Sequence, residues 1–304
     1  MAKSDGNADV PAQAYMPSDE YRFAWLFVVP ALLLSLSVVA FPVGATILLS
    51  LTDWSGLGSP RFVGLSNFAA LFAEPRFWTA AGNNLIYTTT FVTVPMIIAL
   101  VAAALLMLIK IGRTFYQVVF FLPVTIATII LAQVWRGMIY SPVTGIVAWL
   151  QGLGLNVGNP LADPSTALFG VMLVDIWHWW GYLTVIYFAA FRQVDVSLIE
   201  AAFVDGASYS AAFRYILLPM IRPTIFFMIL MTVIWSFRVF DWIYILTEGG
   251  PGFSSEVLGT IAYKTAFQQM SVGRASAYSL VMSMLGMLAI GIYLRVQYKA
   301  EKQA

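Results

Sequence analysis

The residues that could do chemistry in this chain are ionisable side chains within long apolar segments. Asp175 and His178 lie in the apolar stretch 168–191, and Arg238 and Asp241 lie in the stretch 223–246. Each pair is spaced i, i+3, so on a helix its two members can meet on one face. Ionisable groups inside a membrane segment are costly to bury and are usually functional. These four residues are therefore the first candidates for a binding or ion-coupling site.

Aromatic and hydroxyl side chains surround the same positions. Trp179 and Tyr182 share a helical face with Asp175 and His178, and Trp235 lies among Thr232 and Ser236. Aromatic rings that stack on the C–H faces of a sugar, together with a few hydrogen-bonding groups, suit sugar recognition. The alternative is an aromatic belt at the membrane interface, which Trp and Tyr also favour. For Trp177 and Trp180 the two interpretations are balanced, whereas Tyr182 and Trp235 lie nearer mid-segment and favour a site.

Several classes of chemistry are absent from the sequence. There is no cysteine and His178 is the only histidine, so the sequence predicts no metal site. The expected structural role of His178 is a hydrogen bond to Asp175 or to a backbone carbonyl. No Walker A, Gly-x-Ser-x-Gly or His-Glu-x-x-His pattern occurs. We therefore expect no catalytic residue and no cofactor in this chain. A net charge of +1 argues against nucleic acid as a partner.

Composition places the chain in a lipid bilayer. Of its 304 residues, 60% are hydrophobic and only 10% are charged, against about 25% charged in soluble domains. Six apolar segments approach or exceed the length of about 20 residues that spans a membrane: 23–51, 85–109, 115–135 (broken near Pro123), 168–191, 223–246 and 275–294. We predict an all-α, polytopic membrane protein with six transmembrane helices in a domain 23–295, flanked by polar cytoplasmic tails 1–22 and 296–304.

The basic residues predict the orientation of these segments. With both termini inside, the inner side carries ten Lys and Arg and the outer side carries five. This asymmetry is the one expected of a membrane protein with cytoplasmic termini. It places the polar loop of about 196–219 in the cytoplasm, and the glycine-rich segment 247–252 outside, as a flexible loop.

The polar loop between the fourth and fifth segments has a helical pattern of its own. The segment 196–205 places Leu198, Ala201, Ala202 and Asp205 at i, i+3, i+4, i+7 spacing. Gly206 permits a sharp turn, and prolines at 219 and 223 precede the next apolar segment. The loop is built either to dock a partner or simply to join two spans.

Specific motifs resemble a known family. Glu200-Ala201-Ala202, Gly206, Ile216 and Leu218-Pro219 match the EAA loop of ATP-binding-cassette (ABC) importer permeases at every fixed position. Two further regions resemble outer loops of the maltose-type sugar permeases, namely Phe62-Val63-Gly64-Leu65 with Asn67-Phe68 and Phe77-Trp78, and the segment 246–252. The resemblance runs from about residue 23 to residue 295.

The resemblance implies a fold, partners and sites. The fold would be that of type I ABC importer permeases, in a bacterial inner membrane and surrounded by lipid. The chain would pair with a second permease, a cytoplasmic ATPase dimer that binds ATP and Mg, and an extracytoplasmic solute-binding protein. ATPase coupling would fall to Glu200, Ala201, Ala202, Asp205 and Gly206, and binding-protein contact to Thr247, Gly249, Gly250 and Pro251. Substrate would contact Thr128, His178, Trp179, Tyr182, Thr232, Trp235, Ser236 and Arg238.

Ligand identity stays open at this point. Ser236 and Val239 stand where the maltose permeases have amides, so a sugar, polyol or glycoside other than maltose is expected. Arg238 either pairs with Asp241 one turn away or receives an anionic group of the ligand. Two rival functions remain: an ion-coupled secondary transporter that uses Asp175 and Asp241, and a polytopic membrane enzyme with Asp175 and His178 as an acid–base pair.

Overall fold

The computed structural model describes residues 20–303, so most of the predicted tail 1–22 lies outside the described residues. The chain forms two units that divide after Leu48. In the first, helix α1 (Glu20–Ser35) leads through a π-helical turn, η1 (Leu36–Ala40), into α2 (Phe41–Ser50). This π-helical turn comes directly before Pro42, which lacks the N–H of a regular helix. From Phe27 to Leu48 the large apolar side chains are exposed, as a lipid-facing helix requires.

The second unit begins with short elements. Strands β1 (Thr52–Asp53) and β2 (Arg61–Phe62) pair antiparallel, with Thr52 opposite Phe62, and α3 (Ser66–Ala73) follows. The Nδ2 of Asn67 donates to the carbonyl oxygens of Ser50 and Thr52 at 2.8 and 2.9 Å, which fixes α3 to the preceding segment. These elements fill the stretch expected to be an outer loop with short helical pieces.

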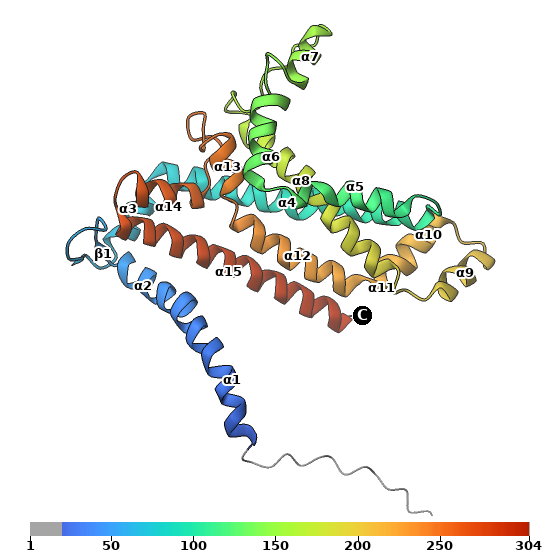
Figure 1. Ribbon diagram of the computed structural model, residues 1–304, viewed down its shortest axis with the longest axis horizontal. Coiled ribbons are helices and arrows are strands. Elements are labelled where there is room, and N and C mark those ends of the chain that lie inside the picture. The colour runs from blue at the N-terminus through green and yellow to red at the C-terminus, as the bar shows by residue number, and fades with distance from the viewer. Residues whose placement is uncertain (1–19, 304) are drawn as a thin grey trace, which may run out of the picture. The chain divides into compact units, whose positions relative to one another are not determined.

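Long helices form the body of the second unit. Helix α4 (Pro75–Leu108) packs along α8 (Ala167–Phe191), α5 (Arg113–Thr125) packs on α8, and α12 (Arg222–Phe237) lies between α4 and α15 (Val272–Gln303) (Figure 1). Small residues let the helices approach closely, since Ala99 and Ala103 of α4 are fully buried beside Tyr187 and Phe191 of α8.

Six membrane spans are present if each bent helix pair counts as one. Within the described residues, four helices are long and apolar enough to cross a bilayer: Phe27–Ser50, Pro75–Leu108, Ala167–Phe191 and Val272–Arg295. The other two spans are bent pairs. Helix α5 meets α6 (Thr128–Val134), with its π-helical extension η2 (Trp135–Ile139), at 95°, close to Pro123. The segment Tyr209–Met220 (α10, Tyr209–Ala212; η3, Phe213–Leu217; α11, Leu218–Met220) meets α12 at 70°, just before Pro223. The all-α, six-span fold is confirmed.

The fifth apolar segment differs from the expectation. Instead of one helix over 223–246, α12 ends at Phe237 and a separate helix, α13 (Asp241–Leu246), begins four residues later. Trp242 and Ile243 of α13 are buried in a core cluster with Val171 and Val174 of α8. The gain from burying these side chains outweighs the backbone hydrogen bonds lost at the break. Arg238 is therefore the C-cap of α12 and does not lie within a helix.

The other boundaries shift outward. Helix α4 starts at Pro75 instead of residue 85, because proline suits the first turn of a helix, so Phe77 and Trp78 are helical. Helix α15 continues to Gln303, through the predicted tail 296–304. The loop before α8 holds the short helix α7 (Ile146–Gly152), and the last outer loop holds α14 (Leu258–Phe267). Helix α9 (Val196–Val204) lies at one end of the long helices, and β1, α3 and α14 lie at the other (Figure 1).

Candidate substrate and coupling sites

A cavity of about 230 Å³ forms where the two helix breaks meet. The α5–α6 break places Thr128 at the start of α6, and the α12–α13 break contributes the segment 238–241. Irregular backbone at membrane depth is tolerated only where protein buries it or a cavity receives it. The lining residues come from α4, α6, α8, α12, α13 and this break: Phe91, Thr128, Asp175, His178, Trp179, Trp235, Arg238, Val239, Phe240, Asp241 and Trp242.

Aromatic rings make one wall of the cavity. Trp179 of α8 and Trp235 of α12 stack with centroids 4.6 Å apart and an interplanar angle of 21°. Tyr182 packs edge-on against both rings, at 5.3 and 6.0 Å, without lining the cavity itself. Trp177 packs on Trp135 and Trp180 packs on Phe120, so neither belongs to this wall. Trp179 and Trp235 therefore line the cavity, whereas Trp177 and Trp180 pack elsewhere.

His178 does not make the bond that its spacing predicts. Although 96% of its surface is buried, neither ring nitrogen has a hydrogen-bond partner, and the ring contacts Trp179 and Trp242 at 5.3 Å. Asp175 instead accepts a hydrogen bond from the hydroxyl of Tyr87 on α4, at 2.5 Å. Buried polar atoms normally find a partner. The two ring nitrogens, at a cavity wall, are therefore available to a ligand or to water.

Arg238 and Asp241 both line the cavity and are exposed, yet no ion pair joins them in the part of the chain that the structure describes. The expected i, i+3 pairing assumed one continuous helix. Because the helix breaks between them, Arg238 caps α12 and Asp241 opens α13. The guanidinium therefore lines the cavity without a carboxylate partner among residues 20–303.

Two predicted substrate residues lie in packed interior instead of at the cavity. Thr232 is fully buried and donates to the carbonyl of Met228 at 2.7 Å. Ser236 is 1% exposed and donates to Thr88 of α4 at 3.0 Å. The Ser236 bond joins α12 to α4, and Thr232 Oγ1 also lies 3.7 Å from Met96 Sδ of α4. Asp175, Asp241 and Val239 also line the cavity: the two carboxylates were candidates for a binding or ion-coupling site, and Val239 stands where the maltose permeases have an amide. Phe91, Phe240 and Trp242 were not predicted. The signal that could have found Trp242 was its position four residues after Arg238, in the mainly apolar segment 239–246.

Helix α9, in the loop predicted to couple to an ATPase, has well-formed ends. At its start Asp195 is the N-cap, and its Oδ1 accepts from the Ser197 amide at 2.9 Å, which lowers the pKa of the Asp195 carboxyl. At its end the Gly206 amide donates to Phe203 and the Ala207 amide to Ala202, at 3.1 and 2.9 Å. This is a Schellman motif, with Gly206 at φ +85°. The turn predicted at Gly206 is confirmed, and glycine suits it because a residue without a Cβ adopts a positive φ at little cost.

No residue of α9 is buried within this chain. Val196, Leu198 and Val204 are 58%, 45% and 88% exposed, and Glu200, Ala201 and Asp205 are exposed as well. Ala202, Ile199 and Ala207 are half-buried. An apolar helix that leaves this much surface uncovered is typical of an interaction site.

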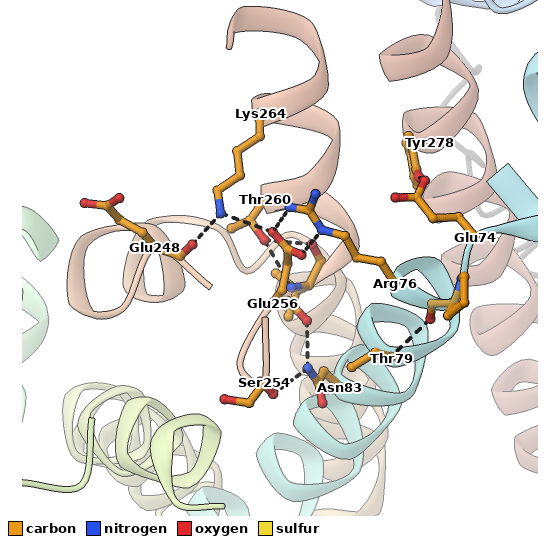
Figure 2. Close-up of polar contacts among 12 residues, drawn as sticks. Glu74, Arg76, Thr79, Asn83, Glu248, Ser254, Glu256, Thr260, Lys264 and Tyr278 are labelled. Carbon is orange, nitrogen blue, oxygen red and sulfur yellow. Dashed lines mark hydrogen bonds and ion pairs between the residues drawn. The ribbon is translucent and has the colours of Figure 1, made fainter. Parts of the chain in front are cut away.

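The segment 247–256, predicted to lie outside, is closed by hydrogen bonds, although its glycines predict flexibility. Ser255 Oγ donates to the Gly250 carbonyl at 2.7 Å and lies 2.8 Å from Thr247 Oγ1, and Lys264 Nζ donates to the Glu248 carbonyl at 2.6 Å. Below the loop, Glu256 lies between Arg76 and Lys264 (Figure 2). Of the predicted contact residues, Thr247, Gly250 and Pro251 are half-buried, whereas Gly249 is buried against Glu256.

Comparison with known proteins identifies the family. Residues 67–301 match the family model described as binding-protein-dependent transport system inner membrane component. The chain belongs to this family. It is 34% identical, over 91% of its own length and 95% of the relative's, to a probable starch degradation products transport system permease of Thermoanaerobacterium thermosulfurigenes. The permease is thus an ABC importer subunit, which favours that function over an ion-coupled transporter or a membrane enzyme.

Solved structures share the fold of the permease. A crystal structure of a bacterial ABC transporter involved in importing the acidic polysaccharide alginate contains a chain with a TM-score of 0.83 and 21% identity, over 92% of this chain and 96% of that one. A second structure, of the alginate transporter in complex with an alginate pentasaccharide-bound periplasmic protein, gives a TM-score of 0.80 and 22% identity, over 90% and 93%. The type I permease fold is confirmed.

Proposed function

We propose that this permease carries a sugar, polyol or glycoside across a bacterial inner membrane, driven by ATP hydrolysis in a partner ATPase. The observation that carries the proposal is α9, a capped apolar helix with no buried residue, at one end of the membrane helices. Both termini, and α9 with them, would face the cytoplasm, in agreement with the excess of basic residues on that side.

The ATPase would receive α9 in a cleft. Val204 and Leu198 would fill apolar contacts, and the carboxylate of Glu200 would make a charge-assisted contact with a basic group of the ATPase. ATP and Mg would be bound by the ATPase dimer. Its closure on ATP would bring this coupling helix and that of the second permease together, and the spans would rock between outward and inward access.

The cavity between the helix breaks would hold the substrate. At about 230 Å³ it is smaller than the 300–1,000 Å³ usual for ligand pockets, so a second permease would complete the site. Trp179 and Trp235 would offer an aromatic wall to a sugar ring, and His178 would hydrogen-bond a hydroxyl. The relative named for starch degradation products and the alginate transporter support a carbohydrate as the cargo.

Arg238 favours an anionic group on that carbohydrate. A cation at membrane depth costs about 2.5 kcal/mol or more unless compensated, and Asp241 forms no ion pair with it. A carboxylate or sulfonate on the ligand would bind the planar guanidinium through two parallel hydrogen bonds. Arg238→Gln should then assemble normally and lose uptake of the charged substrate. The matched variant Asp241→Asn should retain uptake.

The main proposal is tested by uptake into proteoliposomes that contain the permease, its ATPase and its second permease, with the binding protein outside. Uptake should require ATP inside and survive collapse of the proton gradient. Uptake that stops when the gradient collapses while ATP remains would refute an ATP-driven importer. An Arg238→Gln complex that transports a charged sugar normally would refute the anionic assignment and leave the importer intact.

A further inference from the structure

Phe253 is an exposed aromatic residue of the loop between α13 and α14. Its side chain is 49% exposed and its backbone has a φ of +65°. A side chain larger than that of glycine disfavours this left-handed conformation, so a phenylalanine persists there only where its surroundings impose the geometry. Strained backbone conformations are common at functional sites, and here the strained residue carries a large, half-exposed apolar ring.

A charge network fixes this geometry. The guanidinium of Arg76 lies 4.2 Å from the centre of the Phe253 ring, a cation–π contact, and Arg76 also donates two hydrogen bonds to Glu256, one of them at 2.6 Å. Lys264 approaches Glu256 at 3.2 Å. Asn83 of α4 donates at 2.8 Å to the carbonyls of both Ser254 and Glu256, near the end of the loop (Figure 2).

The network is costly for an ordinary linker. The Glu256 side chain is 1% exposed, and a buried carboxylate is stable only with partners. Its partners come from two other elements, since Arg76 lies on α4 and Lys264 on α14. One buried carboxylate therefore ties the loop to α4 and α14, so that the position of Phe253 follows these two helices.

We propose that Phe253 anchors the solute-binding protein and that Glu256 is the positioning residue that presents it. This rests on the proposed function. The family is binding-protein-dependent by description, and one transporter of the same fold was solved with a periplasmic protein. The loop lies at the end of the unit opposite to α9. An exposed aromatic ring on a rigid support is the usual centre of an interface, and the partner would offer it an apolar pocket.

The experiment uses the assembled importer in lipid discs and titrates its liganded binding protein while ATP hydrolysis is measured. Phe253→Ala should raise the half-saturating concentration of binding protein by about tenfold or more. Its matched control is Phe267→Ala, the same residue type at 69% exposure on α14, which should leave the titration unchanged. Glu256→Gln should raise the half-saturating concentration by a smaller factor with little change in the maximal rate, because an amide keeps one acceptor for Arg76.

The double variant separates positioning from a general structural role. If Glu256 acts through Phe253, then adding Glu256→Gln to Phe253→Ala should weaken binding no further. An unchanged titration for Phe253→Ala in an importer that the binding protein still stimulates would refute the anchor alone. A Glu256→Gln importer with a lower melting temperature and maximal rate, and an unchanged half-saturating concentration, would refute its positioning role. A wild-type importer that the binding protein does not stimulate would refute the proposed function together with the anchor.

Discussion

Gly181 of α8 lies directly against the backbone of α5, and its replacement by alanine is a sharp test of the packing. A Cβ atom at Gly181 of α8 would lie 1.8 Å from the carbonyl oxygen of Phe120 on α5, and 2.5 Å from its carbonyl carbon. An ordinary contact needs about 3.4 Å, so α5 and α8 would have to separate by about 1.6 Å at this point. Glycine at this crossing lets two backbones touch.

The expected energy follows from two opposing terms. Overpacking of a close contact costs about 1–3 kcal/mol. Alanine in place of glycine gains about 0.8–1 kcal/mol in helix propensity. Gly82→Ala, in α4 with nothing within 4 Å of its Cβ, receives only the gain. We therefore expect Gly181→Ala to be less stable than Gly82→Ala by about 1–3 kcal/mol, the overpacking term alone.

The assay is thermal unfolding of the purified complex followed by tryptophan fluorescence, paired with uptake. Gly181→Ala should melt several degrees below Gly82→Ala and transport less, because α8 carries His178 and Trp179 to the cavity. Truncation of the Phe120 side chain should not rescue it, since the clash is with backbone. Equal melting temperatures for the two alanine variants, or full rescue by Phe120→Ala, would refute the close α5–α8 contact.

Three further predictions concern the coupling helix. In Gly206→Leu the new side chain meets open space, but the φ of +85° imposes strain of about 1–2 kcal/mol, which should lower the uptake per ATP hydrolysed about 5- to 30-fold. Gly158→Leu, in open space at an ordinary φ, should leave this ratio unchanged, and equal ratios for the two variants would contradict the prediction. Val204→Asp, at a side chain 88% exposed, should leave membrane insertion intact and abolish co-purification of the ATPase; normal co-purification would exclude α9 from the interface. The hydrogen bond from Ser197 lowers the pKa of Asp195, so the cap stabilises α9 above the unfolded pKa of about 4 and is lost as pH falls through the folded value. The hydrogen-exchange protection factors of α9, which correct for the intrinsic pH dependence of exchange, should therefore fall on acidification in wild type but not in Asp195→Asn.

The sequence by itself determined the architecture and the turn in the predicted coupling loop. Six apolar segments near 20 residues long predicted six spans, because the bilayer imposes that length on each segment independently of the others. The helix that ends at Gly206 was equally predictable, since its cap and its turn depend on residues within one short stretch. The resemblance to the maltose-type permeases, and not local spacing, grouped Thr128, His178, Trp179, Trp235 and Arg238, and all five line the cavity.

Only the tertiary structure decided which polar groups meet. Spacing paired Asp175 with His178 and Arg238 with Asp241, whereas the fold gives Asp175 to Tyr87, 88 positions away, and breaks the helix between Arg238 and Asp241. Glu256 is bound to Arg76, 180 positions away, and this contact turns a glycine-rich segment into a fixed loop. A periodic pattern in the sequence shows only which residues share a face of one helix. The partner of a buried charge is set by the helices that pack around it, and this packing depends on the whole chain.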